Sequence, residues 1–278
     1  MNRSAIAAIA RLELAEVLRS RWIVFCGVVY AVLATTFVLI GMRESTIVGF
    51  TGMGRALLSF THALVFLLPL LALTATGQVV NSAREDGALE LIFGHPIGRR
   101  EWFTAVTLVR FGVLAIPLLV TMPLLCLIGW AAFGQAVPWS WMLKSQLVSA
   151  TLIACFVAIG LLISALVRNA SRALITILLV WTASVALIDF GLVGLMLQSQ
   201  LEPRLVFLLA ALNPVQGSRM ALMSAAEPEL ATLGPVGFYL SNHVGAAGLL
   251  AIGTAWPALL GVALWSLAAR RFRRGDLV

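Results

Sequence analysis

The side chains that could carry catalysis in this chain are few, and their spacing excludes the common catalytic motifs. A phosphate-binding P-loop needs a lysine directly after a glycine, but the one lysine of the 278 residues, Lys144, follows Leu143. The three histidines, His62, His95 and His243, lie far apart, so there is no His-Glu-x-x-His zinc motif. We therefore predict that the chain has no catalytic residues, is not an enzyme and carries no cofactor.

Metal binding by methionine is a second chemistry that the sequence could support, because thioethers are good ligands for Cu(I). Met220 and Met223 are three residues apart on one expected helix, and His243 follows in the same segment between two apolar stretches. Scattered methionines in a membrane protein are more often packing residues. We therefore assign no metal site and keep these three residues as weak candidates.

Asp189 is the one acidic residue inside an apolar stretch long enough to cross a membrane. A carboxylate at that depth is costly unless it is paired or hydrated, which makes it a candidate functional residue. Two interpretations remain open. Asp189 belongs to a functional site, or it lies near the outer end of its span and reaches water or a neighbouring hydroxyl group.

The composition explains why so little polar chemistry is present. Hydrophobic residues make up 61% of the chain and charged residues only 11%, whereas soluble domains contain about 45–50% and 25%. The mean hydropathy is +1.01. These values predict an integral membrane protein. The net charge of +7 then reflects membrane topology and attraction to anionic lipid rather than binding to nucleic acid.

Six apolar stretches are long enough to cross a bilayer as helices, which requires about 20 residues each. We expect an all-α membrane protein with spans at Trp22–Met42, Ala56–Val80, Leu108–Phe133, Ser145–Val167, Ala173–Leu197 and Val244–Ala269. Thirteen arginines fall on the side of the two chain ends and five basic residues on the other. Both ends are therefore predicted to be cytoplasmic, because basic residues concentrate on that side.

Three segments outside the expected spans have sequence patterns that predict further helices. Residues 1–21 are amphipathic and predict a helix along the inner membrane surface. Residues 82–93 predict a short cytoplasmic helix with an apolar edge, ended by Gly94. In the long outer segment, residues 198–243, Asn213-Pro214 predicts a helix start, with asparagine as cap and proline in the first turn.

The inner loop between the second and third spans resembles the cytoplasmic coupling region of ABC-2 type permeases. The matching residues are Arg84-Glu85-Asp86-Gly87-Ala88-Leu89-Glu90-Leu91-Ile92, followed by Pro96-Ile97-Gly98-Arg99-Arg100-Glu101. Gly98 stands where serine is usual in the family, and with Glu101 three residues on it is expected to cap a second helix. Six spans with both ends inside, Leu212-Asn213-Pro214 and the tail Phe272-Arg273-Arg274-Gly275-Asp276-Leu277 extend the resemblance over most of the chain.

The resemblance implies an exporter-like permease (type V) of the bacterial inner membrane that pairs with a second copy of itself. Two copies of a cytoplasmic ATPase would hold the ATP and magnesium. The expected ATPase-coupling residues are Arg84, Glu85, Asp86, Leu89, Glu90, Ile92 and Phe93. A periplasmic accessory protein would contact Asn213, Pro214, Arg219, Met220 and Met223.

Within the family, three features are similar to the permeases of transporters that support maturation of nitrous oxide reductase. They are the overall length, the loop variant Gly94-His95-Pro96-Ile97 and the stretch Asn213-Pro214-x-x-x-x-Arg219-Met220. That resemblance implies movement of a sulfur- or copper-related species for assembly of the reductase's copper–sulfur centre. A general exporter of drugs or lipids is the alternative within the family. A secondary carrier or a membrane scaffold that never meets an ATPase is the alternative from a different class.

Overall fold

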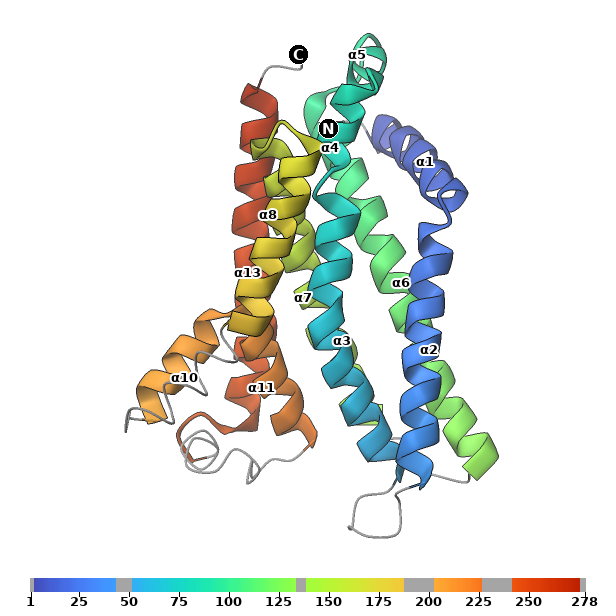
Figure 1. The fold of residues 1–278 in the computed structure, drawn as a ribbon, viewed down its shortest axis with the longest axis vertical. Coiled ribbons are helices and arrows are strands. Elements are labelled where there is room, and N and C mark those ends of the chain that lie inside the picture. The colour runs from blue at the N-terminus through green and yellow to red at the C-terminus, as the bar shows by residue number, and fades with distance from the viewer. Residues whose placement is uncertain (1–2, 44–51, 134–138, 188–202, 227–241, 276–278) are drawn as a thin grey trace.

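The computed structural model describes residues 3–43, 52–133, 139–187, 203–226 and 242–275, and every regular element within them is helical. In chain order the elements are α1 (Arg3–Arg19), α2 (Trp22–Arg43), α3 (Gly52–Thr76), α4 (Val79–Glu85), α5 (Ala88–Phe93), α6 (Arg99–Phe133), α7 (Trp139–Leu166), α8 (Ala170–Thr182), the π-helical turn η1 (Ala183–Leu187), α10 (Pro203–Leu212), α11 (Pro214–Ala226) and α13 (Gly245–Arg274). Figure 1 shows the long helices running side by side.

Four helical stretches are long and apolar enough to cross a membrane: His62–Glu85, Arg99–Ile128, Trp139–Leu166 and Gly245–Arg274. The pair Arg3–Arg19 and Val24–Thr36, bent by 60°, makes a fifth if the two helices are counted as one span. The predicted all-helical membrane protein is thus confirmed, while the count of six spans stays a prediction. The fifth expected span, Ala173–Leu197, is described only through Leu187, so Asp189 lies outside the described residues.

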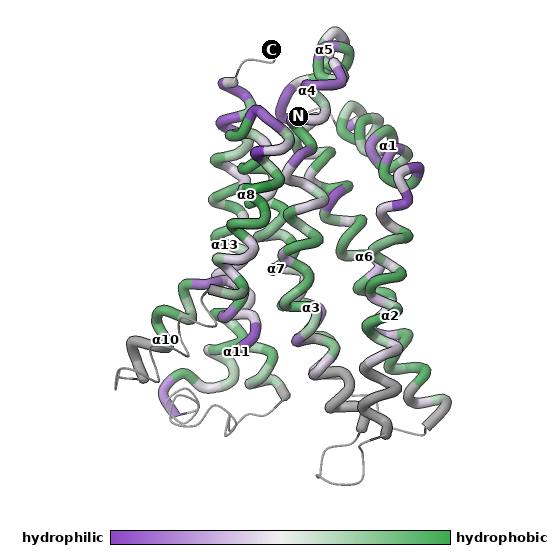
Figure 2. The backbone as a smooth tube through the Cα atoms, viewed as in Figure 1, coloured by the Kyte–Doolittle hydropathy of each residue, from purple (hydrophilic) through white to green (hydrophobic). Residues whose placement is uncertain are grey.

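The bundle has two chemically distinct ends. The first turn of α1, the last turn of α13 and the α4–α5 corner lie at one end (Figure 1), which we call the α5 end. Hydrophilic residues gather there, whereas the long helices below are mainly hydrophobic (Figure 2). Helices α10 and α11 lie towards the opposite end. This arrangement agrees with the prediction that residues 82–93 and the chain ends share one side of the membrane.

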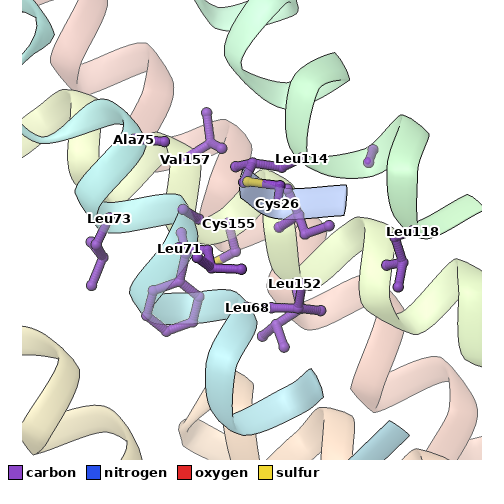
Figure 3. Close-up of a cluster of buried hydrophobic side chains, with 14 of the residues drawn as sticks. Cys26, Leu68, Leu71, Leu73, Ala75, Leu114, Leu118, Leu152, Cys155 and Val157 are labelled. Atoms are coloured by element: carbon purple, nitrogen blue, oxygen red, sulfur yellow. The ribbon is translucent and has the colours of Figure 1, made fainter. Parts of the chain in front are cut away.

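Helix α7 is the central element, and it packs against α3, α6 and α13. Figure 3 shows the core where α2, α3, α6 and α7 meet, with Cys26, Leu68, Leu114, Leu152 and Cys155 pointing into one cluster. Burial of these side chains needs closely spaced helices. Small residues provide that spacing in membrane proteins, where contact between apolar side chains and lipid is already favourable.

The local structure differs from the expected helix bounds at two places. The cytoplasmic helix expected over residues 82–93 is two helices, because Gly87 adopts a left-handed φ of 68° between α4 and α5. Helix α4 also begins at Val79, before the expected start at residue 82. The third span was expected to begin at Leu108, but α6 runs unbroken over 35 residues from Arg99. No glycine or proline precedes Leu108 in that helix to break it.

Helices α10 and α11 form a hairpin whose apex, at Leu212-Asn213-Pro214, points towards the middle of the bundle (Figure 1). Helix α11 packs closely on α13. At the contact, the Ser218 hydroxyl donates to the Gly253 carbonyl at 3.3 Å. Gly253 has no room for a side chain, since a Cβ there would lie 2.6 Å from the Gly217 carbonyl oxygen.

We expect Gly253→Ala to lower the free energy of unfolding by about 1–3 kcal/mol, because the added methyl group meets backbone atoms of α11. Gly27→Ala on α2 is the matched control, as a Cβ at Gly27 meets nothing within 4 Å. Replacing glycine by alanine favours the helix by about 1 kcal/mol at either position. A difference in stability between the two variants therefore reports the clash at Gly253. Thermal unfolding in detergent measures both. Equal or greater stability of Gly253→Ala would contradict the close α11–α13 contact.

Candidate functional site

The α4–α5 corner is anchored in the transmembrane helices. Val80 of α4 is buried, and its backbone N–H donates to the Ser164 hydroxyl of α7 at 2.9 Å. Gly87 then turns the chain in the left-handed conformation that glycine adopts without strain. Helix α5 follows as a six-residue helix that ends at Gly94, as predicted. The corner therefore projects from the bundle but is joined to its central helix.

The apolar residues of α5 divide between two opposite faces. Leu89 is only 1% exposed and belongs to the core, and Ile92 and Phe93 are half-buried against it. Leu91 is 74% exposed. The expectation that Leu89 contacts an ATPase is thus corrected: in this conformation its side chain faces the permease interior. Leu91, which sequence reasoning did not select, is the apolar side chain that α5 presents outward.

The spacing of the apolar residues of α5 in the sequence already indicated this division into two faces. Residues three and four apart share a helix face, so Leu89, Ile92 and Phe93 form one apolar face and Leu91 lies on the other. A face of three apolar side chains on so short a helix packs inward when a core is adjacent. The sequence showed the face, but it did not show that the permease's own core would cover it.

Edge-to-face and tilted aromatic contacts join α5 to the ends of α6 and α13. The Phe93 ring lies 6.3 Å from both the Trp102 ring of α6 and the Phe272 ring of α13, measured between centroids. Phe272 in turn stacks on Trp102 at 5.1 Å and on Phe103 at 5.4 Å. Such ring pairs add to the stability that burial already supplies. A displacement of α5 would therefore act directly on α6 and α13.

Arg99 adds a polar connection beside this aromatic cluster. Its guanidinium donates from Nη1 to the carbonyl oxygens of Arg273 (2.9 Å) and Gly275 (2.8 Å). These carbonyls lie at the end of α13, where a helix lacks internal partners and carries partial negative charge. At the start of α6, the Gly98 N–H donates to Glu101 Oε2 at 3.0 Å, which confirms the predicted cap. The first turn of α6 and the last turn of α13 are thus fixed to each other.

The predicted charged coupling residues surround the corner. Glu85, Asp86 and Glu90 are exposed, and Arg84 is half-buried. Beneath them lies a cavity of about 260 Å³ between α1, α3, α4, α5 and α6, bordered by Asp86. Whether these charges contact a partner stays a prediction.

An ion pair closes the α1 side of that cavity. Glu13 of α1 and Arg110 of α6 approach to 3.7 Å. Burial raises the pKa of the Glu13 carboxyl, and Arg110 acts in the opposite direction. Arg110 of α6 therefore has an ion-pair partner in α1.

The outer hairpin is held at its apex by neighbouring helices. Asn213 is 4% exposed, and its Oδ1 accepts from the Val215 N–H at 3.0 Å, so the predicted helix start is confirmed. Its side-chain amide donates to the Ser184 carbonyl in η1. The Trp256 indole of α13 donates to the Leu212 carbonyl at 3.0 Å. The apex is thus joined to η1 through the Asn213 amide and to α13 through the Trp256 indole.

The outer candidate residues do not form one site. Met220 is 8% exposed and packs with Phe207 and Leu249, and Met223 lies against the same cluster. His243 is exposed, before the start of α13. The described residues contain no group of three or more His, Cys, Asp or Glu side chains that could hold a metal ion. The packing interpretation therefore accounts for both methionines.

Burial also corrects the expected contacts with a periplasmic partner. Asn213 and Met220 are buried within the chain, so neither side chain is available at the surface. Pro214, Arg219 and Met223 are half-buried and remain candidates. Asn213 instead positions the hairpin.

Comparison with known proteins identifies relatives over nearly the whole chain. Residues 7–277 match the family described as ABC-2 family transporter protein. The "Probable ABC transporter permease protein NosY" of Pseudomonas aeruginosa is 30% identical over 284 residues, covering 96% of this chain and 95% of the relative. The protein of the same name from Stutzerimonas stutzeri is 31% identical over 282 residues, covering 96% and 97%.

Two alanine substitutions on α5 test the division of its faces. Phe93→Ala should lower the free energy of unfolding by about 2 kcal/mol, less than the ~3–5 kcal/mol of a fully buried phenylalanine, because Phe93 is half-buried. Leu91→Ala removes an exposed side chain and should change stability by less than about 0.5 kcal/mol. Thermal unfolding of the two purified variants measures the difference. A larger loss for Leu91→Ala would show that α5 is rotated relative to this description.

Proposed function

The chain belongs to the ABC-2 family of transporter proteins as a permease, and from that premise we propose its place in a larger transporter. Two copies of the chain assemble in the bacterial inner membrane with two copies of a cytoplasmic ATPase. The transporter moves a sulfur- or copper-related species that is used to assemble the copper–sulfur centre of periplasmic nitrous oxide reductase. The relatives named NosY and the loop resemblance support this role.

We further propose six spans with both chain ends in the cytoplasm, which places the α5 end inside the cell. The excess of arginines on this side supports the orientation. Residues 1–21 then lie at the inner surface, and residues 22–278 form the transmembrane domain, with the outer loop 198–243 in the periplasm. Within this loop, α10 and α11 make a hairpin that could receive a periplasmic accessory protein.

The observation that carries the coupling proposal is the position of α5. It presents Leu91, at 74% exposure, from a corner whose other face is packed into the bundle. An exposed apolar side chain at this tip is accessible to a partner, as a coupling contact requires. The exposed acids Glu85, Asp86 and Glu90 surround it and would set the register of that contact.

The contacts behind α5 suggest how ATP hydrolysis in the partner would act on the permease. Closure of the two ATPases would push α5, and Phe93 would pass the displacement to Trp102 of α6 and Phe272 of α13. Arg99 keeps the ends of these two helices together. The movement would then reach the membrane as a rigid-body shift of spans rather than a local distortion. Hydrolysis itself takes place in the ATPase, which holds the ATP and magnesium.

Substitution of Leu91 tests the coupling proposal. Leu91→Asp should leave the permease folded, because the side chain is exposed, and should weaken ATPase binding about tenfold or more, as loss of an interface anchor does. Co-purification from membranes with the tagged permease measures this binding. Ser82→Asp adds the same charge at an exposed position of α4 and should retain the ATPase. Normal ATPase recovery with Leu91→Asp would contradict docking through α5.

Deletion of the permease gene tests the biological role. Nitrous oxide reductase purified from the deletion strain should lack the absorption and copper content of its copper–sulfur centre. A plasmid with the intact permease should restore both, and one with Leu91→Asp should not. A reductase with a complete centre in the deletion strain would remove the maturation role and leave a general exporter. If no ATPase accompanies a folded permease, the coupling proposal fails as well.

A further inference from the structure

Two cavities on the membrane side of the bundle join into one groove. The first, of about 440 Å³, lies between α6, α7 and α13 and is almost wholly apolar, with Phe111, Ala154 and Ala258 among its walls. The second, of about 300 Å³, lies between α6 and α13 towards the α5 end. Thr104 and Trp265 line both cavities. The groove thus passes continuously from an apolar part to a polar mouth.

The spacing of the lining residues shows that this groove follows the helix axes. On α6 the lining residues are Arg100, Phe103, Thr104, Thr107, Leu108 and Phe111; on α13 they include Ala258, Gly261, Val262, Trp265, Ala269, Arg270 and Arg273. Steps of three and four residues keep each set on one face of its helix. From Ala258 to Arg273 the rise is about 22 Å. Half of a bilayer's hydrocarbon core is about 15 Å, so the groove has the length of one leaflet and its headgroups.

Three arginines surround the polar mouth. Arg100 of α6 and Arg270 and Arg273 of α13 line the second cavity together with the Ser266 hydroxyl. Glu101, which borders a neighbouring hollow with Arg100 and Arg273, accepts a hydrogen bond from the Gly98 N–H. One guanidinium group can donate two parallel hydrogen bonds to a phosphate, and it retains its charge at all physiological pH values. The mouth is therefore suited to an anionic phosphate.

Trp265 occupies the junction of the two parts. Its indole N–H donates to the Thr107 hydroxyl at 2.9 Å, and its ring lies 6.0 Å from the Phe103 ring. These contacts fix an aromatic side chain at the level where the apolar walls give way to arginines. Tryptophan favours this depth, between acyl chains and headgroups, in membrane proteins.

We propose that this groove is a binding site for an anionic phospholipid of the inner leaflet. One acyl chain lies along Ala154, Ala258 and Phe111, and the headgroup phosphate meets Arg100, Arg270 and Arg273. The assignment concerns a site apart from the proposed coupling surface on α5. An acidic segment of a cytoplasmic protein could reach the arginines, but it could not follow the groove into its apolar depth. A lipid matches both parts.

Native mass spectrometry of the purified permease with added lipid tests the site. Palmitoyl-oleoyl phosphatidylglycerol should be retained more strongly than the phosphatidylcholine with the same chains. Substitution of Arg100, Arg270 and Arg273 by glutamine should weaken retention roughly fivefold for each arginine, the effect of about 1 kcal/mol per charge near a membrane surface. The control replaces Arg3, Arg19 and Arg172, which are exposed on α1 and α8, and should retain the lipid.

A second pair of variants tests the acyl-chain part without changing charge. Ala154→Phe with Ala258→Phe fills the groove and should reduce phosphatidylglycerol retention severalfold. Ala263→Phe, at an exposed position of α13 that does not line the groove, should have no such effect. Thermal unfolding establishes that each variant is folded. If the filled variant is unstable, the arginine variants, which alter side chains at the groove mouth only, decide the question.

Three results would overturn the proposal. Equal retention of the two lipids would mean that the groove is not selective for an anionic headgroup. Competition by millimolar inorganic phosphate, combined with no effect of the filled groove, would mean that the arginines bind free phosphate. Loss of the ATPase from the arginine variant with unchanged lipid retention would make the mouth a protein contact. None of these outcomes depends on the transported species, so they leave the proposed function untouched.

Discussion

Helix α7 can lie directly against α3 and α13 because glycine occupies both contacts, and the positions of the other spans follow from this. A Cβ at Gly160 would overlap the Thr76 hydroxyl of α3, and one at Gly261 would lie 3.0 Å from the Cα of Cys155 on α7. In a bilayer, apolar burial alone does not hold helices together, so the gain comes from close packing. With α7 fixed, Val80 can bond to Ser164 and place the α4–α5 corner.

Similar kinds of side-chain contact stabilise the two ends of the bundle. At the α5 end, aromatic stacking and Arg99 fasten α5, α6 and α13 into one unit, while Leu91 stays outside it. At the opposite end, Asn213 and Trp256 hold the apex of the hairpin against η1 and α13. In both places side chains that donate to backbone carbonyls join elements distant in the sequence. Helix α13 takes part in the contacts at both ends, so a shift of α13 would alter the contacts at either end.

The proposed lipid groove adjoins the proposed coupling path. Arg273 lines the groove mouth, and its carbonyl accepts the hydrogen bond from Arg99. Phe103 belongs to the aromatic cluster and also lines the groove mouth. A lipid bound there would contact both spans that α5 is proposed to move. The inner leaflet could thus influence how firmly α6 and α13 are held together.

The sequence by itself determined the features that depend on local chemistry. Runs of apolar residues predicted the helical membrane class, and Asn213-Pro214 and Gly98 with Glu101 predicted two helix starts that are confirmed. Only the tertiary structure decided which faces are covered. Leu89 and Leu91 have the same side chain two residues apart, yet one is 1% and the other 74% exposed. Helices α6 and α13, distant in the sequence, bring Trp102 and Phe272 against Phe93, which shares the buried face of α5 with Leu89. From the sequence, Met220 was kept as a weak metal-ligand candidate because of its thioether. The structure instead packs it with Phe207 and Leu249, a contact that requires α10, α11 and α13 to come together.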